Sequence, residues 1–311
     1  MILTVTANSA LDKVIYIEEF IPTTDMRSRQ MVESVGGKGF DTSVVLASLG
    51  VPNLALGIVA GSSGKRLEQL LDGYGIPSDL VWVDGETRVA NVIVETLHNR
   101  QSHVVTPGYV VAEAAAAEFT RRYCEHLQKT DWVIASGSLP EGLPADYYGR
   151  LAQLARQAGV KFLVDCSGEP LRLAVQGQPT ILKMNRSEFE QAFGIRGSTV
   201  KELAKLARAF RIEQGLPALV ITCGMDGILA ITGEGEFLAA SPAQVEVNSA
   251  GAGDAASAAI PWRLSLGESW SDALRWGAAV SAAVVLTPGT ADCNSDDVAR
   301  ILPESQVWAI D

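Results

Sequence analysis

Four residues in the last third of the chain, Gly251-Ala252-Gly253-Asp254, combine a glycine turn with a carboxylate. They follow an alternating segment, Val245-Glu246-Val247, and precede small residues at 255–259, which predicts a strand, a tight turn and a helix. Glycines let a ligand approach the backbone closely, and the free N–H groups at a helix start bind phosphate. Asp254 in the first helical turn is therefore a candidate general base, although an isolated segment of this kind more often only caps a helix.

The composition is that of an ordinary globular protein. The chain has 311 residues, of which 47% are hydrophobic and 20% charged, enough for one large α/β domain or two smaller ones. The formal net charge of −11 argues against a general nucleic-acid binder, because phosphate backbones are held by an excess of Lys and Arg. A local basic pocket for a small phosphorylated ligand remains compatible with this charge.

No metal-site, secretion or membrane pattern is recognisable. The four cysteines form no C-x-x-C pair, and with only three histidines no zinc spacing occurs, so we expect reduced thiols. The N-terminus lacks the features of a signal peptide, and the longest apolar stretch, residues 276–286, is shorter than the roughly 20 residues of a membrane span. We expect a cytoplasmic protein without a membrane partner.

Strand and helix patterns alternate over most of the chain, which predicts a parallel sheet with helices on both faces. Two strand pairs, within about 12–35 and 87–106, break this rhythm, and we expect them to form a separate small sheet; Leu97-His98-Asn99-Arg100 is the expected turn of the second. No linker divides the chain, so we predict a single domain over 1–311. The other expected strands are 2–6, 54–59, 132–135, 161–165, 180–184 and 218–222, and the expected helices are 40–49, 67–71, 112–127, 145–157, 170–175 and 199–213.

Turn-forming polar residues follow four of these strands at the point where each strand ends. Because the carboxyl ends of parallel strands share the edge at which ligands bind, we expect the motifs to form one binding edge together with the glycine–aspartate turn. Each motif taken alone could be simple turn chemistry. The motifs are Ser136-Gly137-Ser138-Leu139-Pro140, Asp165-Cys166-Ser167-Gly168, Lys183-Met184-Asn185-Arg186-Ser187-Glu188 and Thr222-Cys223-Gly224-Met225-Asp226-Gly227.

No other phosphate-binding motif competes with the glycine–aspartate turn. Gly61-Ser62-Ser63-Gly64-Lys65 has the wrong spacing for a Walker P-loop, and the protein-kinase motifs do not occur. A phosphoryl-transfer enzyme built from this sequence would therefore use the glycine turn as its phosphate cradle.

Over almost its whole length the chain resembles the PfkB family of ribokinase-like carbohydrate kinases. The two family signatures appear as Gly36-Gly37-Lys38-Gly39-Phe40-Asp41 and Asn248-Ser249-Ala250-Gly251-Ala252-Gly253-Asp254, with the 136–140 and 185–188 motifs between them in family order. The resemblance implies a ribokinase-like α/β fold, a central mostly parallel sheet with helices on both faces plus a small β-sheet lid. Asn8-Ser9-Ala10-Leu11-Asp12, Thr87-Arg88 and Gly142-Leu143-Pro144 are similar to the bacterial hexose-phosphate kinase branch.

The same resemblance implies roles at the nucleotide end of the site. Asp254 would take the proton of the acceptor hydroxyl while Gly251, Ala252 and Gly253 donate N–H groups to the γ-phosphoryl group of ATP. Asn185 and Glu188 would hold Mg²⁺ through its water shell, although the residues alone indicate only a helix N-cap. The remaining expected nucleotide contacts are Lys183, Thr222, Gly224, Asp226 and Gly227.

At the sugar end, Arg27 and Arg88 would bind the substrate phosphate from the lid, or alternatively be solvated arginines on a hairpin. Asp41 stands where the family has an asparagine; an ionised aspartate only accepts hydrogen bonds and adds negative charge near a phosphorylated substrate. The expected contacts to the sugar itself are Asp12, Gly36, Gly37, Lys38, Gly39, Asp41 and Ser138.

The resemblance therefore implies an ATP-dependent kinase of a hexose phosphate, first of all one converting fructose 1-phosphate to fructose 1,6-bisphosphate. Tagatose 6-phosphate, fructose 6-phosphate or an unphosphorylated sugar are alternative acceptors. An alternative of another class is a sugar- or nucleotide-binding protein with weak or no turnover. We also expect a homodimer through the lid, because its strands carry apolar residues on both faces; they are Val14, Ile15, Ile17, Val92, Ile93 and Val94.

Overall fold

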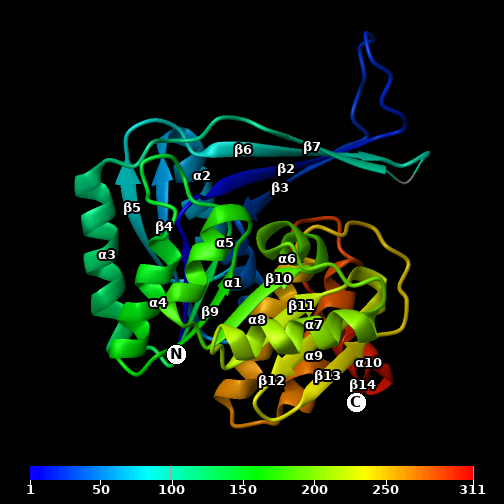
Figure 1. The fold of residues 1–311 in the computed structure, drawn as a ribbon. Helices are drawn as coiled ribbons and strands as arrows, with labels where there is room; N and C mark the ends of the chain where they lie inside the picture. Colours follow the sequence, from blue (N-terminus) through cyan, green and yellow to red (C-terminus); the bar gives the residue numbers. More distant parts are fainter. Residues whose placement is uncertain (99, 311) are drawn as a thin grey trace.

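The computed structural model describes residues 1–98 and 100–310, and its main sheet has ten strands (Figure 1). In chain order they are β1 (Ile2–Thr6), β4 (Asn53–Ala60), β5 (Ser78–Val83), β8 (Trp132–Ser136), β9 (Lys161–Asp165), β10 (Ile181–Asn185), β11 (Ala218–Thr222), β12 (Ile228–Thr232), β13 (Glu236–Ala240) and β14 (Gln306–Ala309). Their spatial order is β14-β13-β12-β11-β10-β9-β8-β1-β4-β5. The seven strands from β11 to β5 pair in parallel, whereas β12 to β14 are antiparallel.

Helices cover both faces of this sheet, as the alternating pattern predicts. One face carries α3 (Glu113–Leu127), α4 (Tyr147–Gln157), α5 (Gly168–Ala174), α6 (Arg186–Phe193) and α7 (Val200–Glu213). The other carries α1 (Lys38–Ser48), α2 (Gly61–Gly73), α8 (Ala252–Ser265), α9 (Trp270–Val284) and α10 (Ser295–Ile301). Short 3₁₀ turns lie at Val175–Gly177, Gly224–Asp226 and Leu302–Glu304.

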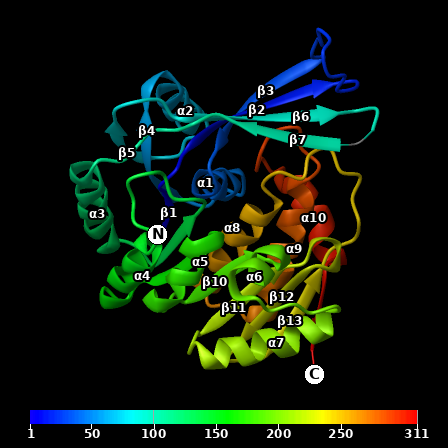
Figure 2. The same ribbon diagram turned by 45° about the horizontal axis from the view of Figure 1, so that its top comes forward.

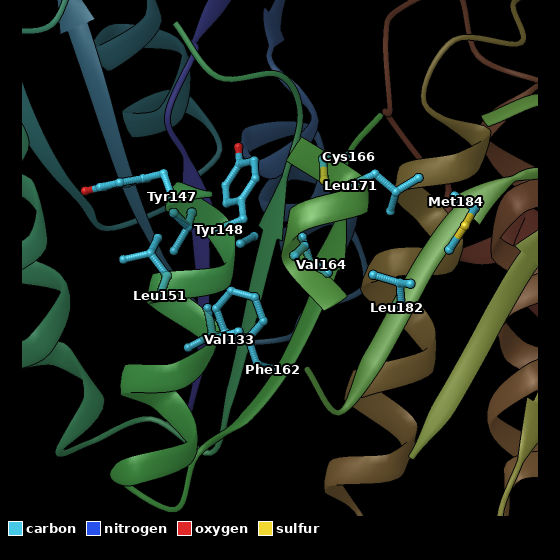
Figure 3. Close-up of a cluster of buried hydrophobic side chains, with 14 of the residues drawn as sticks. Val133, Tyr147, Tyr148, Leu151, Phe162, Val164, Cys166, Leu171, Leu182 and Met184 are labelled. Atoms are coloured by element: carbon cyan, nitrogen blue, oxygen red, sulfur yellow. The ribbon is translucent and has the colours of Figure 1, made fainter. Parts of the chain in front are cut away.

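The inner parallel strands are apolar on both sides because both sides are buried. In β9, Phe162 and Val164 belong to the hydrophobic cluster under α3 to α7, whereas Leu163 belongs to the cluster under α8 and α9. Figure 3 shows part of the first cluster, to which Phe162 of β9 and Leu151 of α4 both belong. The continuous apolar runs in the sequence are therefore a consequence of the two helical layers.

A separate small sheet confirms the lid-like excursion predicted from the two strand pairs. Its strands are β2 (Ala10–Ile17), β3 (Gln30–Gly36), β6 (Arg88–Glu95) and β7 (Arg100–Val105), in the order β3-β2-β6-β7. Strands β2 and β6 are parallel and the other two pairs antiparallel. Figures 1 and 2 show the β2–β3 connection, drawn in dark blue, projecting away from the rest of the molecule. Asn99 of the expected turn lies outside the described residues.

The strand expected at Val245-Glu246-Val247 is wrong, because these residues form a loop. The side chain of Val245 is 87% exposed, and the N–H of Val247 bonds to the carbonyl of Val285 at the end of α9. The neighbour of β13 on its outer side is β14, from the end of the chain. The antiparallel group β12 to β14 and strand β5 were not predicted, and helix α2 is longer than the expected 67–71.

None of the helices in the described part of the chain has the length and apolarity that a bilayer crossing requires.

Candidate active site

The polar motifs after β8, β9, β10 and β11 lie along one edge of the main sheet, because these four strands are neighbours and parallel. As predicted, the four motifs share one edge of the sheet. The glycine–aspartate turn begins helix α8, and it follows a loop instead of a strand.

The glycine turn is held in a conformation that other residues would not tolerate. Gly251 is the N-cap of α8 with φ +90°, and a Cβ atom there would come within 2.5 Å of the main-chain nitrogen of Ala291. The N–H of Ala252 makes only a long bond of 3.4 Å to the carbonyl of Ser249. Since the first N–H groups of a helix have no partner within the helix, this turn can donate hydrogen bonds to an anion.

Asp254 lies in the first turn of α8 and is 6% exposed. Its Oδ1 atom is buried and has no hydrogen-bond partner. Burial raises the pKa of Asp254 to about 7, and the nearby charge of Lys38 opposes this shift. A carboxyl group with a pKa of about 7, beside the N–H groups of a helix start, has the protonation behaviour that a general base needs near neutral pH.

Beneath the turn, Asp165 pairs with two lysines from different elements. Its Oδ2 atom lies 2.5 Å from Nζ of Lys183, and its Oδ1 atom lies 3.3 Å from Nζ of Lys38. Ser257 of α8 donates to Oδ2 at 3.0 Å. Burial alone would raise the pKa of Asp165, but Lys183 and Lys38 hold it at about 2, so the carboxylate is ionised.

The expected nucleotide contact Lys183 is buried beneath the glycine turn. Its Nζ atom also donates to the main-chain carbonyl of Gly253 at 2.8 Å. With Asp165 it therefore holds the turn in place. The sequence placed Asp165 in one of the motifs of the binding edge but indicated no role of its own for this residue. The available signal was an acidic residue at the end of a strand that is otherwise apolar.

Asn185 and Glu188 form a complete capping box at the start of α6. The Asn185 side chain accepts from the N–H of Glu188, and Oε2 of Glu188 accepts from the N–H of Asn185, both at 2.8 Å. The other carboxylate oxygen, Oε1, lies 3.6 Å from Nζ of Lys38 and faces the site. Within the described residues no cluster of three or more His, Cys, Asp or Glu side chains could hold a metal ion. The one free carboxylate oxygen fits Mg²⁺ held through its water shell, and does not make a direct cage.

At the sugar end the structure brings Asp12, Arg88 and Ser138 close to the first signature. The guanidinium of Arg88 donates to the carbonyl of Asn8 at 3.2 Å, while its Nε atom is buried without a partner. The amide of Asn8 in turn donates to the hydroxyl of Ser138 at 3.0 Å. Burial raises the pKa of Asp12 to about 7, with Arg88 acting in the opposite direction.

The glycines of the first signature leave room for these groups. A Cβ atom on Gly36 would come within 2.1 Å of Oδ1 of Asp12, and one on Gly39 within 2.4 Å of the Val5 carbonyl oxygen. Gly37 is the N-cap of α1 with φ +96°, which orients Lys38 toward Asp165.

Arg27 is not brought together with these residues. It is exposed in the loop that projects between β2 and β3 (Figure 1). The turn after β11 contains Gly224 and Gly227 at φ +60° and +101°, and its Asp226 pairs with Arg186 of α6 at 3.8 Å. Thr222 precedes this turn at the edge shared by the other motifs.

Asn248 is a site residue whose role sequence reasoning missed. Its side chain is fully buried; it accepts from the N–H of Ala250 and donates to the carbonyl of Gly289, both at 3.1 Å. It also accepts a longer bond of 3.4 Å from Gln101 of β7. Asn248 thus joins the small sheet to the glycine turn. The available signal was its place at the start of the second signature.

Comparison with known proteins agrees with this geometry. The profile of the pfkB family carbohydrate kinases matches residues 4–297. The chain belongs to the pfkB family.

Among curated relatives, an ATP-dependent 6-phosphofructokinase isozyme 2 of Mycobacterium tuberculosis is 33% identical over 96% of this chain and 88% of its own length. A 1-phosphofructokinase of Bacillus subtilis is 29% identical over 99% of both chains. The crystal structure of a possible 1-phosphofructokinase from Thermotoga maritima superimposes with a TM-score of 0.90, at 28% identity and over the full length of both chains.

Family membership makes the chain an ATP-dependent carbohydrate kinase with a ribokinase-like fold. Its relatives place it among the sugar-phosphate kinases of phosphofructokinase type. The predicted family, fold class and enzyme class are thereby confirmed.

Proposed function

We propose that the chain transfers the γ-phosphoryl group of ATP to a hydroxyl group of fructose 1-phosphate, forming fructose 1,6-bisphosphate and ADP. The observation that carries the transfer step is the placement of Asp254, buried and close to neutral pKa, in the first turn of α8. The choice of sugar is supported by the branch-like motifs of the sequence and by the relatives named 1-phosphofructokinase.

In this reaction the acceptor hydroxyl oxygen forms a bond to the γ-phosphorus, and the bond from that phosphorus to the bridging β–γ oxygen breaks. The hydroxyl proton passes to Asp254, and the bond electrons leave on ADP. The N–H groups of Gly251, Ala252 and Gly253 would donate hydrogen bonds to the equatorial oxygens of the phosphoryl group in transfer. Lys38, at the start of α1, would supply positive charge near them. The catalytic effect would come from positioning and electrostatics.

The remaining expected residues have distinct proposed tasks. Arg88 would bind the substrate phosphate, with Asp12 and Ser138 on the sugar hydroxyls. Thr222, Gly224, Asp226 and Gly227 would line the nucleotide pocket. Asn185 and Glu188 would hold Mg²⁺ through its water shell; when bound, this cation neutralises charge on the β- and γ-phosphates.

We further propose a cytoplasmic homodimer in which the small sheets of two chains cover each other. Within one chain, Ile15 pairs with Met31 on one side and with Ile93 on the other, which makes an apolar row across the sheet. Met31 is 53% exposed. An apolar row of this kind on a thin sheet is expected to be covered by a partner.

The test is ADP formation measured with a panel of acceptors: fructose 1-phosphate, fructose 6-phosphate, tagatose 6-phosphate, free fructose and free ribose. The proposal requires the highest kcat/KM for fructose 1-phosphate. A higher kcat/KM for fructose 6-phosphate would instead indicate a 6-phosphofructokinase, as the mycobacterial relative is named. A higher kcat/KM for a free sugar would contradict the proposal that Arg88 binds a substrate phosphate. ATP and sugar-phosphate binding without ADP formation would identify a binding protein.

A further inference from the structure

Asp41, in the first turn of α1, is a buried carboxyl group whose Oδ1 atom has no hydrogen-bond partner. The residue is 4% exposed. Its side chain does not cap the helix, whose N-cap is Gly37. An ionised carboxylate in such a place would lack the donors that normally compensate the loss of water.

Charged groups from four elements lie near Asp41, and the contacts of the two cations among them are to other residues. Asp12 of β2 and Asp254 of α8 add negative charge, whereas Lys38 of α1 and Arg88 of β6 add positive charge. The ammonium group of Lys38 lies between Asp165 and Glu188, and Arg88 donates to the Asn8 carbonyl. Neither cation makes a hydrogen bond to Asp41.

Asp41 retains a proton more readily than an ordinary aspartate. Burial raises the pKa of Asp41 well above its ordinary value, Asp12 and Asp254 raise it further, and Lys38 and Arg88 oppose this less strongly. Asp254 must be ionised to accept the proton of the acceptor hydroxyl. Neighbouring carboxyl groups cannot all ionise together. Of the other two, Asp41 has a buried oxygen without a hydrogen-bond partner and Asp12 has none, so the geometry favours Asp41 as the group that keeps the proton.

We propose that Asp41 is a neutral carboxylic acid in the working enzyme and donates a hydrogen bond from its O–H group to an oxygen atom of the acceptor sugar. This inference rests on the proposed function. A protonated carboxyl group presents one donor and one acceptor, as an amide does, whereas a carboxylate presents acceptors only. Deprotonation of Asp41 therefore removes the donor and places a negative charge against a phosphorylated substrate.

The kinetic test compares the pH dependence of KM for the sugar phosphate in wild type, Asp41→Asn and Asp41→Ala. If only enzyme with protonated Asp41 binds the sugar phosphate, the fraction of enzyme able to bind falls by up to about tenfold for each pH unit above the pKa of Asp41. Wild-type KM for the sugar phosphate should then rise by up to about tenfold per pH unit in that range. Asp41→Asn should lack this rise and have a lower KM than wild type at alkaline pH. Asp41→Ala, without a donor, should have a raised KM at every pH.

Two controls belong to this comparison. The ionisation of the substrate phosphate is common to all three proteins, and KM for ATP should keep the same pH dependence in each. Parallel sugar-phosphate profiles for wild type and Asp41→Asn would overturn the proposal.

A second measurement needs no substrate and separates this proposal from the choice of sugar. Infrared spectra of protein labelled with ¹³C at the aspartate carboxyl groups should retain one protonated-carboxyl band at about pH 8, above the ordinary range of aspartate. Asp41→Asn should lose this band. If no sugar phosphate in the panel is phosphorylated but the band is present and assigned to Asp41, the proton is established and the proposed substrate fails. If wild type shows only carboxylate bands, Asp41 is ionised and the inference fails, whether or not the variant folds.

Discussion

The ammonium group of Lys183 lies 2.8 Å from the main-chain carbonyl oxygen of Gly253 and donates a hydrogen bond to it. Because the same nitrogen pairs with Asp165, strand β10 and strand β9 together hold the first turn of helix α8. Asp254 is the next residue after Gly253. The position of Asp254, the proposed general base, therefore depends on a buried ion pair beneath it.

Removing this support should destabilise the protein strongly. Lys183→Met leaves the Asp165 carboxylate buried with one fewer cation, and breaking a buried pair typically costs about 3–5 kcal/mol of unfolding free energy. The measurement is urea unfolding. Arg150→Met, which breaks the exposed pair with Asp146, is the matched control, with an expected change of about 1 kcal/mol or less. Equal losses of unfolding free energy in the two variants would show that the buried pair stabilises the protein no more than the exposed pair does.

Asp254→Asn should retain nucleotide binding but lower kcat by on the order of 10²-fold or more, the usual loss when a general base is removed. Steady-state kinetics and calorimetric titration with ATP separate the two effects. Asp84→Asn changes an exposed aspartate in the turn after β5 and should leave kcat unaltered. A kcat within a few-fold of wild type for Asp254→Asn would remove the base assignment.

Arg88→Ala should raise KM for the sugar phosphate by about tenfold or more and leave KM for ATP nearly unchanged. The reason is that a charge-assisted bond to a phosphate contributes about 1.5–3 kcal/mol, and 1.4 kcal/mol corresponds to a factor of ten. Equal effects on both substrates would place Arg88 elsewhere. Arg27→Ala tests the second expected phosphate contact in the same assay; an unchanged KM would identify Arg27 as a solvated arginine of the projecting loop.

The buried carboxyl groups should make stability decrease with rising pH. Asp12 and Asp254 both have a pKa of about 7 in the folded protein against 3.8 ordinarily, so the folded state binds more protons between these values. Their contribution to stability is complete below pH 3.8 and is lost as the pH rises to about 7. Asp254→Asn should therefore gain stability relative to wild type across this window, measured by urea unfolding at several pH values. If the difference in unfolding free energy between Asp254→Asn and wild type did not vary with pH, the raised pKa of Asp254 would be contradicted. Asp84→Asn is the control, and its difference from wild type should not vary with pH.

Light scattering at micromolar concentration should give roughly twice the 33.0 kDa chain mass. Met31→Asp puts a charge into the apolar row of Ile15 and Ile93 and should shift the mass toward a single chain. Ile212→Asp changes a residue of helix α7 that is 64% exposed; it is the matched control and should not change the mass. A wild-type protein with the mass of one chain would exclude the proposed dimer.

Local chemistry in the sequence determined six of the seven parallel strands of the main sheet, many of the helices and the motifs of the candidate site. Apolar runs predicted β1, β9 and β11 closely because a strand buried on both faces needs apolar residues throughout. The glycine turn and Asp254 were predictable because they are adjacent in the sequence, and backbone freedom and a helix start are properties of neighbouring residues.

Only the tertiary structure decided what depends on distant residues. Val245-Glu246-Val247 has a strand pattern, but in the folded chain these residues form a loop, and the N–H of Val247 bonds to the carbonyl of Val285 at the end of α9. Asp165 became part of the site because Lys38 and Lys183 converge on it from elements far apart in the sequence. The high pKa of Asp41 likewise depends on burial and on carboxyl groups brought from β2 and α8. The residue types fix which charged and hydrogen-bonding groups the chain carries. Folding determines which of these groups come into contact and how far they are shielded from water.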